Sequence, residues 1–383
     1  MGASYLSAPM AVKRAMLVLG FMTGTSLDAV DMAVLDTDGE VISSFGPAGE
    51  RKLTDFTRDI VLNATRAARR WQRGAPPPAI FSEAAQAVAE EHFAAGEDFL
   101  DEHGLVWSDF DLVAMHGQTV LHERPRGAVR GRSVQLGDGQ WLAGRIGVPV
   151  ALDFRAADIA AGGEGAPLAP TYHQARAAAS GVEPPAAVLN IGGVANITLM
   201  SSSGELAAFD TGPGNGMIDL LVQARGAGRF DSGGRLAAAG RADEAVLAEL
   251  LSDGYFAAPP PKSLDRHDFP LEVLDDLGLE DACATLVAFT AASAARGLDH
   301  AREAPSSLIV TGGGRLNPEV MRALRERMST CVFSAEDVGW RGDSIEAEAF
   351  AYLGARTLRG LPISFPATTG APRPMAGGRI VQP

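Results

Sequence analysis

The chain has 383 residues, 46% of them hydrophobic and 21% charged, with a formal net charge of −14. This length predicts two domains, and the negative charge argues against broad binding to nucleic acid or to an anionic membrane. No apolar run in the sequence reaches the roughly 20 residues that a membrane helix needs. Cys283 and Cys331 form no CxxC pair, which argues against a disulfide framework or a cysteine-ligated zinc site.

The N-terminal residues resemble a signal peptide because Lys13-Arg14 precedes an apolar stretch. That stretch covers only residues 15–22, contains Gly20 and leads directly into a polar motif. We therefore interpret it as a buried first strand behind a loose N-terminal tail. Together with the widely spaced cysteines, this interpretation favours a cytoplasmic location.

Three short strands are predicted near the start of the chain, over residues 16–22, 30–35 and 41–45. Glycine and hydroxyl residues at 23–28, and the Asp-Thr-Asp-Gly sequence at 36–39, separate the three apolar runs. These are residues of tight turns, so the segment is predicted to fold as strand, turn, strand, turn, strand.

The first of these turns carries a cluster of hydrogen-bond donors. The hydroxyls of Thr25 and Ser26 and the amide of Gly24 can clasp a nucleotide phosphate, and Asp28 or Asp31 can hold a metal ion through water. A plain hairpin turn is the alternative interpretation. The sequence does not follow the P-loop pattern, so a P-loop fold is not predicted.

Residues 50–110 are rich in alanine and charge, and we interpret them as scaffold in which Ser82 caps a helix that runs to about Glu102. A strand over residues 111–115 then leads into His116 and Gln118, and side chains that follow a strand can line a cleft. A structural role is the more common one for a lone histidine.

A second polar cluster follows the strand predicted over residues 148–152 and contains Arg155 and Asp158. Ligands of open α/β sheets bind outside the carboxyl ends of strands, and the planar guanidinium of Arg155 suits a carboxylate or phosphate. An ion pair inside the fold is the alternative.

The order strand, turn, strand, turn, strand recurs over residues 187–191, 194–200 and 205–209. Pro184-Pro185 breaks the chain just before it, so we place a domain boundary near residue 183. The recurrence indicates an internal duplication, with one α/β domain over residues 1–183 and another over residues 184–383.

The third of these strands is predicted to end at Asp210 and to open into the glycine-rich loop 211–215. A carboxylate at a strand end beside such a loop suits phosphate chemistry, because backbone amides next to glycine can approach an anion. A glycine-rich β-turn with Asp210 as a turn residue is the alternative.

Helices are predicted to start at about Met217 and to cover residues 235–252 and 281–296. A strand over residues 308–311 then leads into a triple glycine, and Asn317 caps the next helix with Pro318 in its first turn. A strand, a triple glycine and a helix start allow a flat ligand to approach the backbone, so this is a second candidate for nucleotide contact.

The last long helix is predicted to be capped by Asp343 and to run to about Leu358. Glu346 falls in its first turn, where the carboxylate can face a cleft or simply be solvated and stabilise the helix dipole. The tail from Pro362 onward is predicted to be an irregular surface segment.

Taken together, these motifs closely resemble the anhydro-N-acetylmuramic acid kinase family, which belongs to the acetate and sugar kinase, heat-shock ATPase and actin superfamily. The matching stretches follow one another from residue 20 to residue 371. They are GFMTGTSLDAVD, HGQTVLHERP, DFRAADIAAGGEGAPLAP, LNIGGVANITL, FDTGPGNGMID, PKSLDR, TGGGRLNPEVM, IEAEAFAYLGAR and PATTGA. The sequence departs from the family pattern at Thr23, usually serine, at Ala29, usually glycine, at Thr211, in a small-residue position, and in PKSLDR, commonly PKSTGR.

The resemblance implies an α/β fold of two duplicated actin-like ATPase domains, which are ribonuclease H-like mixed sheets flanked by helices, around a central cleft. The last helix, at about 343–358, is expected to return toward the first domain. The implied reaction is ATP-dependent opening of 1,6-anhydro-N-acetylmuramic acid by water, with phosphorylation to N-acetylmuramic acid 6-phosphate in peptidoglycan recycling. Asp210 would accept a proton from the attacking water, and Glu346 would help to place water and sugar. Mg²⁺ is expected with ATP.

The resemblance also implies which residues contact each ligand. For ATP they are Thr23, Gly24, Thr25, Ser26, Leu27, Asp28, Gly192, Gly193, Gly212, Gly214, Asn215, Gly312, Gly313, Gly314 and Asn317. For the sugar they are His116, Gln118, Arg155 and Asp158, and Asp28 is the candidate for holding a metal ion through water.

The expected partners are the anhydro sugar and ATP, with neither nucleic acid nor membrane, and a homodimer is left open. Two other functions stay open at this point. The first is another sugar or carboxylate kinase of the same fold, in which Asp210 deprotonates a substrate hydroxyl and no water is needed. The second is a non-catalytic ATP-binding clamp.

Overall fold

The computed structural model describes residues 14–125, 127, 129–264 and 268–383. The predicted N-terminal tail, over residues 1–13, and Asp265 and Arg266 of the PKSLDR motif lie outside these residues. In the described part of the chain, none of the helices has the length and apolar character that crossing a bilayer requires.

The fold is built on two mixed sheets. The strands of the first are β1 (Met16–Thr23), β2 (Ala29–Thr37), β3 (Ile42–Lys52), β4 (Leu112–Glu123), β5 (Arg132–Leu136), β6 (Val150–Leu152) and β14 (Arg379–Val381). Those of the second are β7 (Ala186–Ile191), β8 (Val194–Met200), β9 (Leu206–Pro213), β10 (Ser307–Thr311) and β11 (Cys331–Ser334). A small hairpin pairs β12 (Pro362–Ser364) with β13 (Met375–Ala376).

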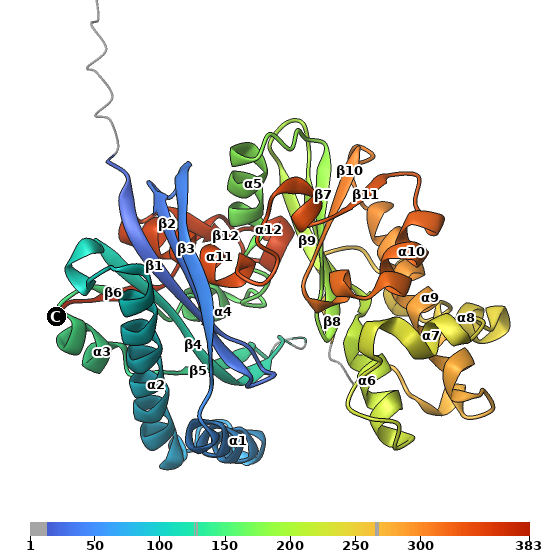
Figure 1. The fold of residues 1–383 in the computed structure, drawn as a ribbon, viewed down its shortest axis with the longest axis horizontal. Helices are drawn as coiled ribbons and strands as arrows, with labels where there is room; N and C mark the ends of the chain where they lie inside the picture. Colours follow the sequence, from blue (N-terminus) through green and yellow to red (C-terminus); the bar gives the residue numbers. More distant parts are fainter. Residues whose placement is uncertain (1–13, 126, 128, 265–267) are drawn as a thin grey trace, which may run out of the picture.

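Helices flank both sheets. Before the second sheet come α1 (Asp55–Arg70), α2 (Ile80–His103), α3 (Gly139–Ile146), α4 (Ala156–Ala161) and α5 (Pro170–Ala179). The rest are α6 (Asn215–Ala224), α7 (Arg235–Ala239), α8 (Glu244–Leu250), α9 (Leu279–Leu298), α10 (Pro318–Arg327), α11 (Ile345–Leu358) and α12 (Pro366–Thr369). Figure 1 shows the two resulting lobes, each around one sheet.

The two sheets have the same strand order. In the first lobe β3, β2 and β1 are antiparallel neighbours, and β4 and then β6 continue the sheet parallel to β1. In the second lobe β9, β8 and β7 are antiparallel neighbours, and β10 and β11 continue parallel to β7. The shared order is what an internal duplication requires, and the predicted α/β class with two mixed sheets is confirmed.

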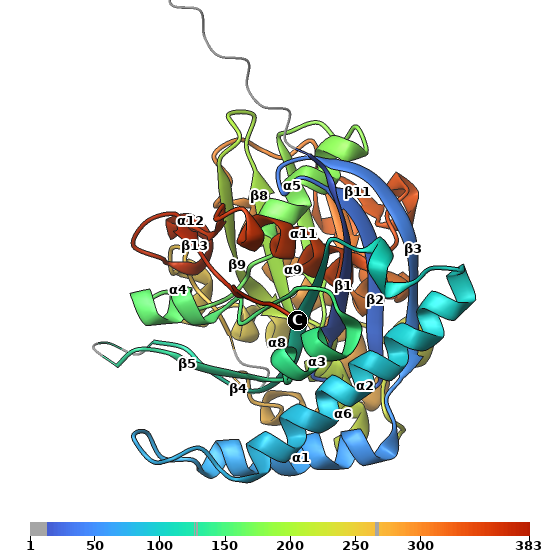
Figure 2. The ribbon, with the colours of Figure 1, turned by 90° about the vertical axis from the view of Figure 1, so that its left-hand side faces the viewer.

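The first sheet is covered on both faces, which explains its nearly continuous apolar strands. Leu19 and Phe21 point into a cluster with residues of α2 and α3, and Val18 points into a cluster with α11 on the opposite face (Figure 2). The helix α11 approaches β1 so closely that a Cβ on Gly20 would lie 2.1 Å from the carbonyl oxygen of Ala347. A glycine at position 20 is therefore needed for this contact.

The cluster that contains Val18 and residues of α11 joins the two lobes. It contains Val18 of β1 and Ala186 and Val188 of β7, together with α11 residues and the fully buried Tyr172 of α5. Helices α5 and α11 thus belong to the core that the two lobes share. The division of the chain into domains at residue 183 stays a prediction.

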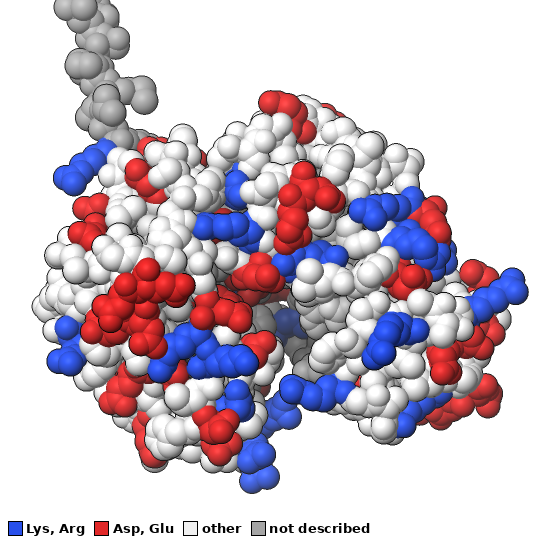
Figure 3. All heavy atoms as spheres, viewed as in Figure 1, with Lys and Arg blue, Asp and Glu red and all other residues white. Residues whose placement is uncertain are grey.

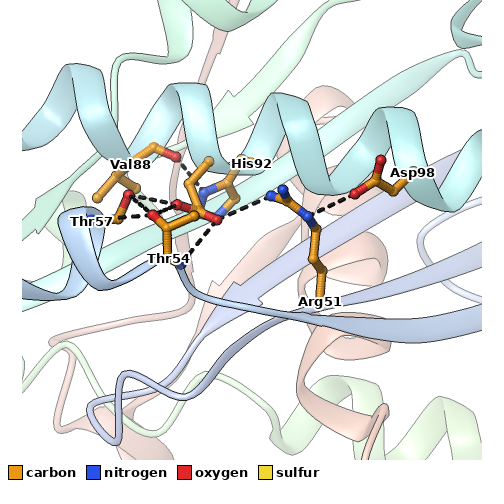
Figure 4. A network of polar contacts seen from close by, with 7 residues as sticks. Arg51, Thr54, Thr57, Val88, His92 and Asp98 are labelled. Carbon is orange, nitrogen blue, oxygen red and sulfur yellow. Dashed lines mark hydrogen bonds and ion pairs between the residues drawn. The ribbon is translucent and has the colours of Figure 1, made fainter.

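A buried carboxylate fixes α1 and α2 on the first lobe (Figure 4). Glu91 of α2 accepts hydrogen bonds from the hydroxyls of Thr54 and Thr57 at 2.5 and 2.6 Å, and it pairs with Arg51 at 3.1 Å. Thr54 is also the N-cap of α1. The polar groups at the start of α1 therefore have partners, as burial requires.

Several predicted boundaries are wrong for one reason: hydrogen bonding in the sheets continues past polar and glycine residues. The strand with His116 does not end at 115 but runs to Glu123, because β5 pairs with it. The strand with Asp210 likewise runs on to Pro213, paired with β8. Both side chains therefore lie within strands rather than after them.

Three helix predictions are also corrected. Ser82 is not a cap, because α2 already begins at Ile80. The helix predicted over 235–252 is two helices, because the backbone at Gly240 is extended, with φ −102° and ψ 177°, and ends α7. Asp343 does not cap α11, because its carboxylate pairs with Arg315 at 2.7 Å.

The cap at Asn317 is confirmed, because its Oδ1 accepts from the amides of Glu319 and Val320. The tail after Pro362 is not irregular. It contains α12 and β12–β14, and β14 pairs with β6 in the first sheet.

Candidate active site

The turn between β1 and β2 presents polar groups from a fixed backbone. Leu27 has a positive φ of 57°, which is uncommon for a residue with a branched side chain and marks local strain. Its side chain is buried, and its carbonyl oxygen accepts from Nε of Arg58 at 3.0 Å. The Ser26 hydroxyl donates to Asp28 at 2.6 Å, while Thr25 and Ser26 stay exposed. These contacts hold both hydroxyl residues at the surface of the lobe.

Strand β4 is hydrogen-bonded to this turn and to the residue before it. The buried Gln118 donates from Nε2 to the carbonyl oxygen of Gly24 at 3.2 Å, and the Thr23 hydroxyl donates to that of Gly117 at 3.3 Å. Gln118 was predicted to contact the sugar. In the structure it instead hydrogen-bonds to the β1–β2 turn, which was predicted to contact phosphate. Its hydrogen bonds place it as a support of that turn.

Three glycine-rich turns of the second lobe come together. The amides of Gly214 and Asn215 donate to the carbonyl oxygens of Gly193 and Gly192, at 3.1 and 2.8 Å. A Cβ on Gly214 would lie 2.3 Å from the oxygen of Gly192, so the loops touch through backbone. Residues without a Cβ are required for such an approach.

The triple glycine joins the same cluster. Gly312 has a φ of +71°, and a Cβ there would lie 2.4 Å from Oδ1 of Asn190, the second-last residue of β7. A Cβ on Gly313 would lie 3.7 Å from the side-chain nitrogen Nδ2 of Asn215. The turns that hold the predicted ATP contacts at 192–193, 212–215 and 312–314 therefore lie side by side, with Gly212, Gly214 and Gly314 buried. Asn317 differs from them, since its side chain is used by the cap of α10.

Arg315 was missed in the sequence, although it follows the triple glycine. Its side chain is buried, and it donates to the carbonyl oxygen of Gly312 at 3.0 Å. It also pairs with Glu336 at 2.8 Å and with Asp343 at 2.7 Å. Arg315 therefore connects the triple glycine to the segment just before α11, which carries Glu346.

His116 and Arg155 are in direct contact. Nε2 of the buried His116 accepts from Nε of Arg155 at 3.2 Å, and its ring packs on Phe350 of α11 with centroids 4.4 Å apart. Burial and the neighbouring guanidinium lower the pKa of His116 well below its usual value, so the ring is neutral. Burial also lowers the pKa of Arg155 to about 10, which leaves it charged at neutral pH.

Glu346, in the first turn of α11, is accessible to solvent although protein surrounds it on several sides. Those surroundings raise its pKa, and the charge of Arg155 opposes the shift. Burial and the charge of Glu346 are the two largest causes that raise the pKa of Asp31 to about 7. Glu346 is therefore close enough for its charge to interact with both Arg155 and Asp31.

These carboxylates were candidates for a metal site. Among the described residues, no three histidine, cysteine or carboxylate side chains gather closely enough to hold a metal ion by themselves. Asp28 nevertheless adds to the charge that raises the Asp31 pKa. A cation held mainly by nucleotide phosphates would relieve this repulsion, so Asp28 and Asp31 fit a water-mediated role.

Asp210, on β9, is held by the segment that contains the PKSLDR motif. Its Oδ2 accepts from the amide of Leu264 at 2.8 Å, and its carbonyl oxygen accepts from the Tyr255 hydroxyl. Burial raises the pKa of Asp210 to about 7, with a further contribution from Glu164, while the Leu264 amide and Arg124 oppose the shift. A carboxylate that titrates near neutral pH suits a general base.

A loop of the first lobe links the two carboxylate regions. Arg155 donates to the carbonyl oxygen of Gly165 at 2.8 Å, and the next residue back, Glu164, accepts from Ser263 beside Leu264. The buried Asp158 shapes this loop, because it accepts from the Gly165 amide and the Thr369 hydroxyl, both at 2.6 Å. Asp158 thus contacts protein groups, and it positions the loop between Asp210 and Glu346.

The surface is hollowed between the two lobes (Figure 3). In Figure 1, the β1–β2 turn of one lobe and the ends of β8 and β9 with α6 of the other lie toward this hollow. A separate cavity of about 730 Å³ lies near α5, α12 and the opposite ends of β8 and β9. None of the predicted site residues line it.

Comparison with known proteins identifies relatives over the whole fold. Residues 16–383 match the family anhydro-N-acetylmuramic acid kinase. The anhydro-N-acetylmuramic acid kinase of Phenylobacterium zucineum is 71% identical over 368 residues, covering 96% of this chain and 100% of that protein. The protein of the same name from Caulobacter vibrioides is 67% identical over 366 residues, covering 96% of this chain and 99% of that protein.

Solved structures are similar only at a distance. A glucokinase of the ROK family from Streptomyces griseus, in complex with glucose and AMPPNP, has a TM-score of 0.41 and 14% identity, covering 88% of this chain and 100% of that one. The activator of 2-hydroxyisocaproyl-CoA dehydratase from Clostridium difficile has a TM-score of 0.40 and 12% identity, covering 90% and 97%. The family match and the close relatives decide the assignment: this chain belongs to the anhydro-N-acetylmuramic acid kinase family.

Proposed function

We propose that the chain is an ATP-dependent kinase that opens 1,6-anhydro-N-acetylmuramic acid with water and phosphorylates it to N-acetylmuramic acid 6-phosphate. Family membership supports the activity. One observation supports the general base that this reaction needs: Asp210, whose pKa is raised to about 7 by burial, is a carboxylate suited to deprotonating a weak nucleophile such as water at neutral pH.

In this reaction Asp210 takes a proton from water as the water oxygen bonds to the anomeric carbon. The bond between that carbon and O6 breaks, and O6 then bonds to the γ-phosphorus while ADP leaves. We propose that Glu346 orients the water and the sugar, since its charge interacts with that of Arg155. A pair of carboxylates around an anomeric carbon is typical of hydrolysis at that centre.

Arg155 and His116 are proposed to bind the sugar as a unit. The Arg155 guanidinium stays charged and suits the carboxylate of a muramic acid, and the neutral His116 holds it in place through Nε2. Gln118 and Asp158 are proposed to act indirectly, through the β1–β2 turn and the 162–166 loop respectively.

ATP is proposed to bind between the lobes. The hydroxyls of Thr25 and Ser26 and the glycine-rich turns around Gly192, Gly212 and Gly312 offer donors to phosphate and a flat backbone surface to adenosine. Mg²⁺ would neutralise charge on the transferring phosphoryl group, with Asp28 and Asp31 bound to it through water.

We further propose a cytoplasmic enzyme of two domains that meet near residue 183. The sugar is a product of cell-wall turnover, so the proposed role is peptidoglycan recycling. A homodimer is one alternative for the oligomeric state, and light scattering on the purified chain would decide it.

The experiment that tests the function measures ADP release with 1,6-anhydro-N-acetylmuramic acid in ¹⁸O-labelled water. We expect ADP to form and ¹⁸O to appear at the anomeric carbon of the product. Appearance of ¹⁸O in phosphate would show that water attacks the γ-phosphorus, which contradicts the water-opening reaction. ADP release only with an ordinary sugar or a carboxylate would also contradict it and would indicate a related kinase. Nucleotide binding without turnover of any acceptor would indicate the clamp.

A glycine substitution tests the proposed adenosine surface. Gly312→Ala places a methyl group 2.4 Å from Oδ1 of Asn190 at a φ of +71°, so the turn must shift. We expect the KM for ATP to rise by roughly tenfold or more, which corresponds to about 1.4 kcal/mol of binding energy. Gly339→Ala is the matched control, because it also has a positive φ but no atoms near its Cβ position. Equal effects on the KM for ATP would exclude a specific role for Gly312.

A further inference from the structure

The Asp210 carboxylate is held in position by the segment Lys262–Leu264. Two residues of the other lobe hold this segment in turn. Besides the Leu264 amide on Oδ2, the amide of Asp210 donates to the carbonyl oxygen of Lys262 at 3.0 Å. Strand β9 and the segment Lys262–Leu264 are thus joined on both sides of Asp210. A movement of this segment would move the amide that binds the carboxylate.

Ser263, in the middle of this segment, is bound from the first lobe at both its side chain and its backbone. Its hydroxyl donates to Oε2 of Glu164, which lies in the loop after α4. Its carbonyl oxygen accepts from Nη1 of Arg124, which directly follows β4. Arg124 also pairs with Asp268 at 3.1 Å. Both residues are partly buried, so solvent screens these contacts less than it would at the open surface.

We propose that Glu164 and Arg124 are positioning residues for the catalytic base: by holding Ser263 they keep the Leu264 amide on the Asp210 carboxylate. This inference rests on the proposed function, in which Asp210 is the base. It makes the base depend on contacts between the two lobes. Asp210 has its working geometry only when the first lobe holds the Lys262–Leu264 segment.

The two residues also act on Asp210 through charge, in opposite directions. The carboxylate of Glu164 disfavours a second negative charge nearby, and the guanidinium of Arg124 favours it. The other groups near Asp210 are the Tyr255 phenol and the ammonium of Lys262, which lies 4.8 Å from the centre of the Tyr255 ring. Asp268 contributes to the field at Tyr255. Arg124 and Glu164 are the charges of the first lobe in this set.

Three variants separate positioning from charge. Glu164→Gln keeps an acceptor for Ser263 but removes the charge, so the acid limb of the kcat/KM profile should move to lower pH by roughly half a unit or more. Arg124→Gln removes the opposing charge and a bond to Ser263, so this limb should move to higher pH. Ser263→Ala removes only the hydroxyl, so kcat should fall by about tenfold as the Leu264 amide loosens, with the KM for ATP unchanged.

Two neighbours serve as matched controls. Glu123 precedes Arg124, but its carboxylate pairs within the first lobe, with Arg73 at 2.7 Å and with Arg132 at 3.0 Å. Glu123→Gln and Arg73→Gln should therefore leave the pH profile in place. A purely structural role for Glu164 and Arg124 predicts that both variants lose kcat/KM equally, with no opposite shifts of the acid limb. That result would overturn the proposal.

A measurement that needs no turnover completes the test. In protein labelled with ¹³C at the aspartate carboxyl carbons, the signal missing from Asp210→Asn reports the titration of Asp210. We expect its midpoint near pH 7 in the wild type, lower in Glu164→Gln and higher in Arg124→Gln. Unchanged midpoints refute the inference, whether or not the anhydro sugar is turned over. Opposite shifts without ADP release from that sugar support it and refute only the proposed substrate.

Discussion

Replacing Asp210 with asparagine should lower kcat by about 10²- to 10⁴-fold, the range that general-base catalysis contributes. Asparagine has nearly the same shape, and its carbonyl oxygen can still accept from the Leu264 amide, which lies 2.8 Å from Oδ2 in the wild type. The variant cannot take a proton from water. ADP release with the anhydro sugar should therefore nearly stop, while the Kd for a non-hydrolysable ATP analogue should change less than threefold.

The same substitution should make the protein more stable above neutral pH. The pKa of Asp210 is about 7 in the folded chain against an ordinary value of 3.8. Between these values the folded state holds a proton that the unfolded state has lost, so the free energy of unfolding falls as pH rises through this window. Asparagine does not titrate. Its variant should match the wild type near pH 4 and have the higher Tm at pH 8.

The pH dependence of activity has the opposite sign. Only ionised Asp210 can accept a proton, so kcat/KM of the wild type should rise with pH and level off above about 7. The ionised form that is active is also the form that lowers the free energy of unfolding. Loss of stability at pH 8 in the Asn variant, or full activity in it, would contradict the assignment of Asp210 as a buried base. Such opposing needs of stability and activity are common at catalytic carboxylates.

Much of the fold could be predicted from local patterns. The apolar runs of β1, β2, β7, β8 and β10 are short, dense and bounded by turn residues, so their positions followed from the sequence. The strand order could not be derived in this way, because it depends on pairing between distant residues, such as Leu308 of β10 with Ala187 of β7. The ends of β4 and β9 were wrong since a paired neighbour, not composition, extends them.

The site was predicted unevenly for the same reason. Asp210 and the glycine turns stand in local motifs with a recognisable chemistry. Glu164 lies in a quoted motif, but its importance comes from Ser263, 99 residues away. Arg315 follows the triple glycine, yet its role depends on Asp343, 28 residues later. A residue whose function depends on distant partners has no local signal that a single sequence could provide.

Replacing Glu348 with alanine should destabilise the folded chain by about 3–5 kcal/mol, since it leaves buried cations without their partner. Glu348, on α11, is fully buried and pairs with Arg341 at 2.6 Å and with Arg176 of α5 at 3.7 Å. The Tyr172 hydroxyl also donates to it. The guanidinium of Arg176 lies 3.9 Å from the centre of the Phe45 ring, so this cluster joins α5, α11 and β3.

The measurement is urea unfolding at pH 7, with Glu326→Ala on the exposed face of α10 as control. Glu326 pairs with Arg322 one turn away, and exposed pairs of this kind contribute about 0.5 kcal/mol or less. Glu348→Gln keeps the shape but not the charge and should lie between the two. A loss below about 1 kcal/mol for Glu348→Ala would show that solvent reaches the cluster.

Glu348 and Glu346 are two positions apart on α11, so their side chains leave the helix on different sides. One is fully buried in the ion-pair cluster that holds α11 against α5, and the other is exposed next to Arg155 and Asp31. A loosened α11 would shift Glu346 as well. We therefore expect the Glu348→Gln variant, in its folded form, to have a lower kcat as well as a lower stability. The Glu326→Ala variant should keep both.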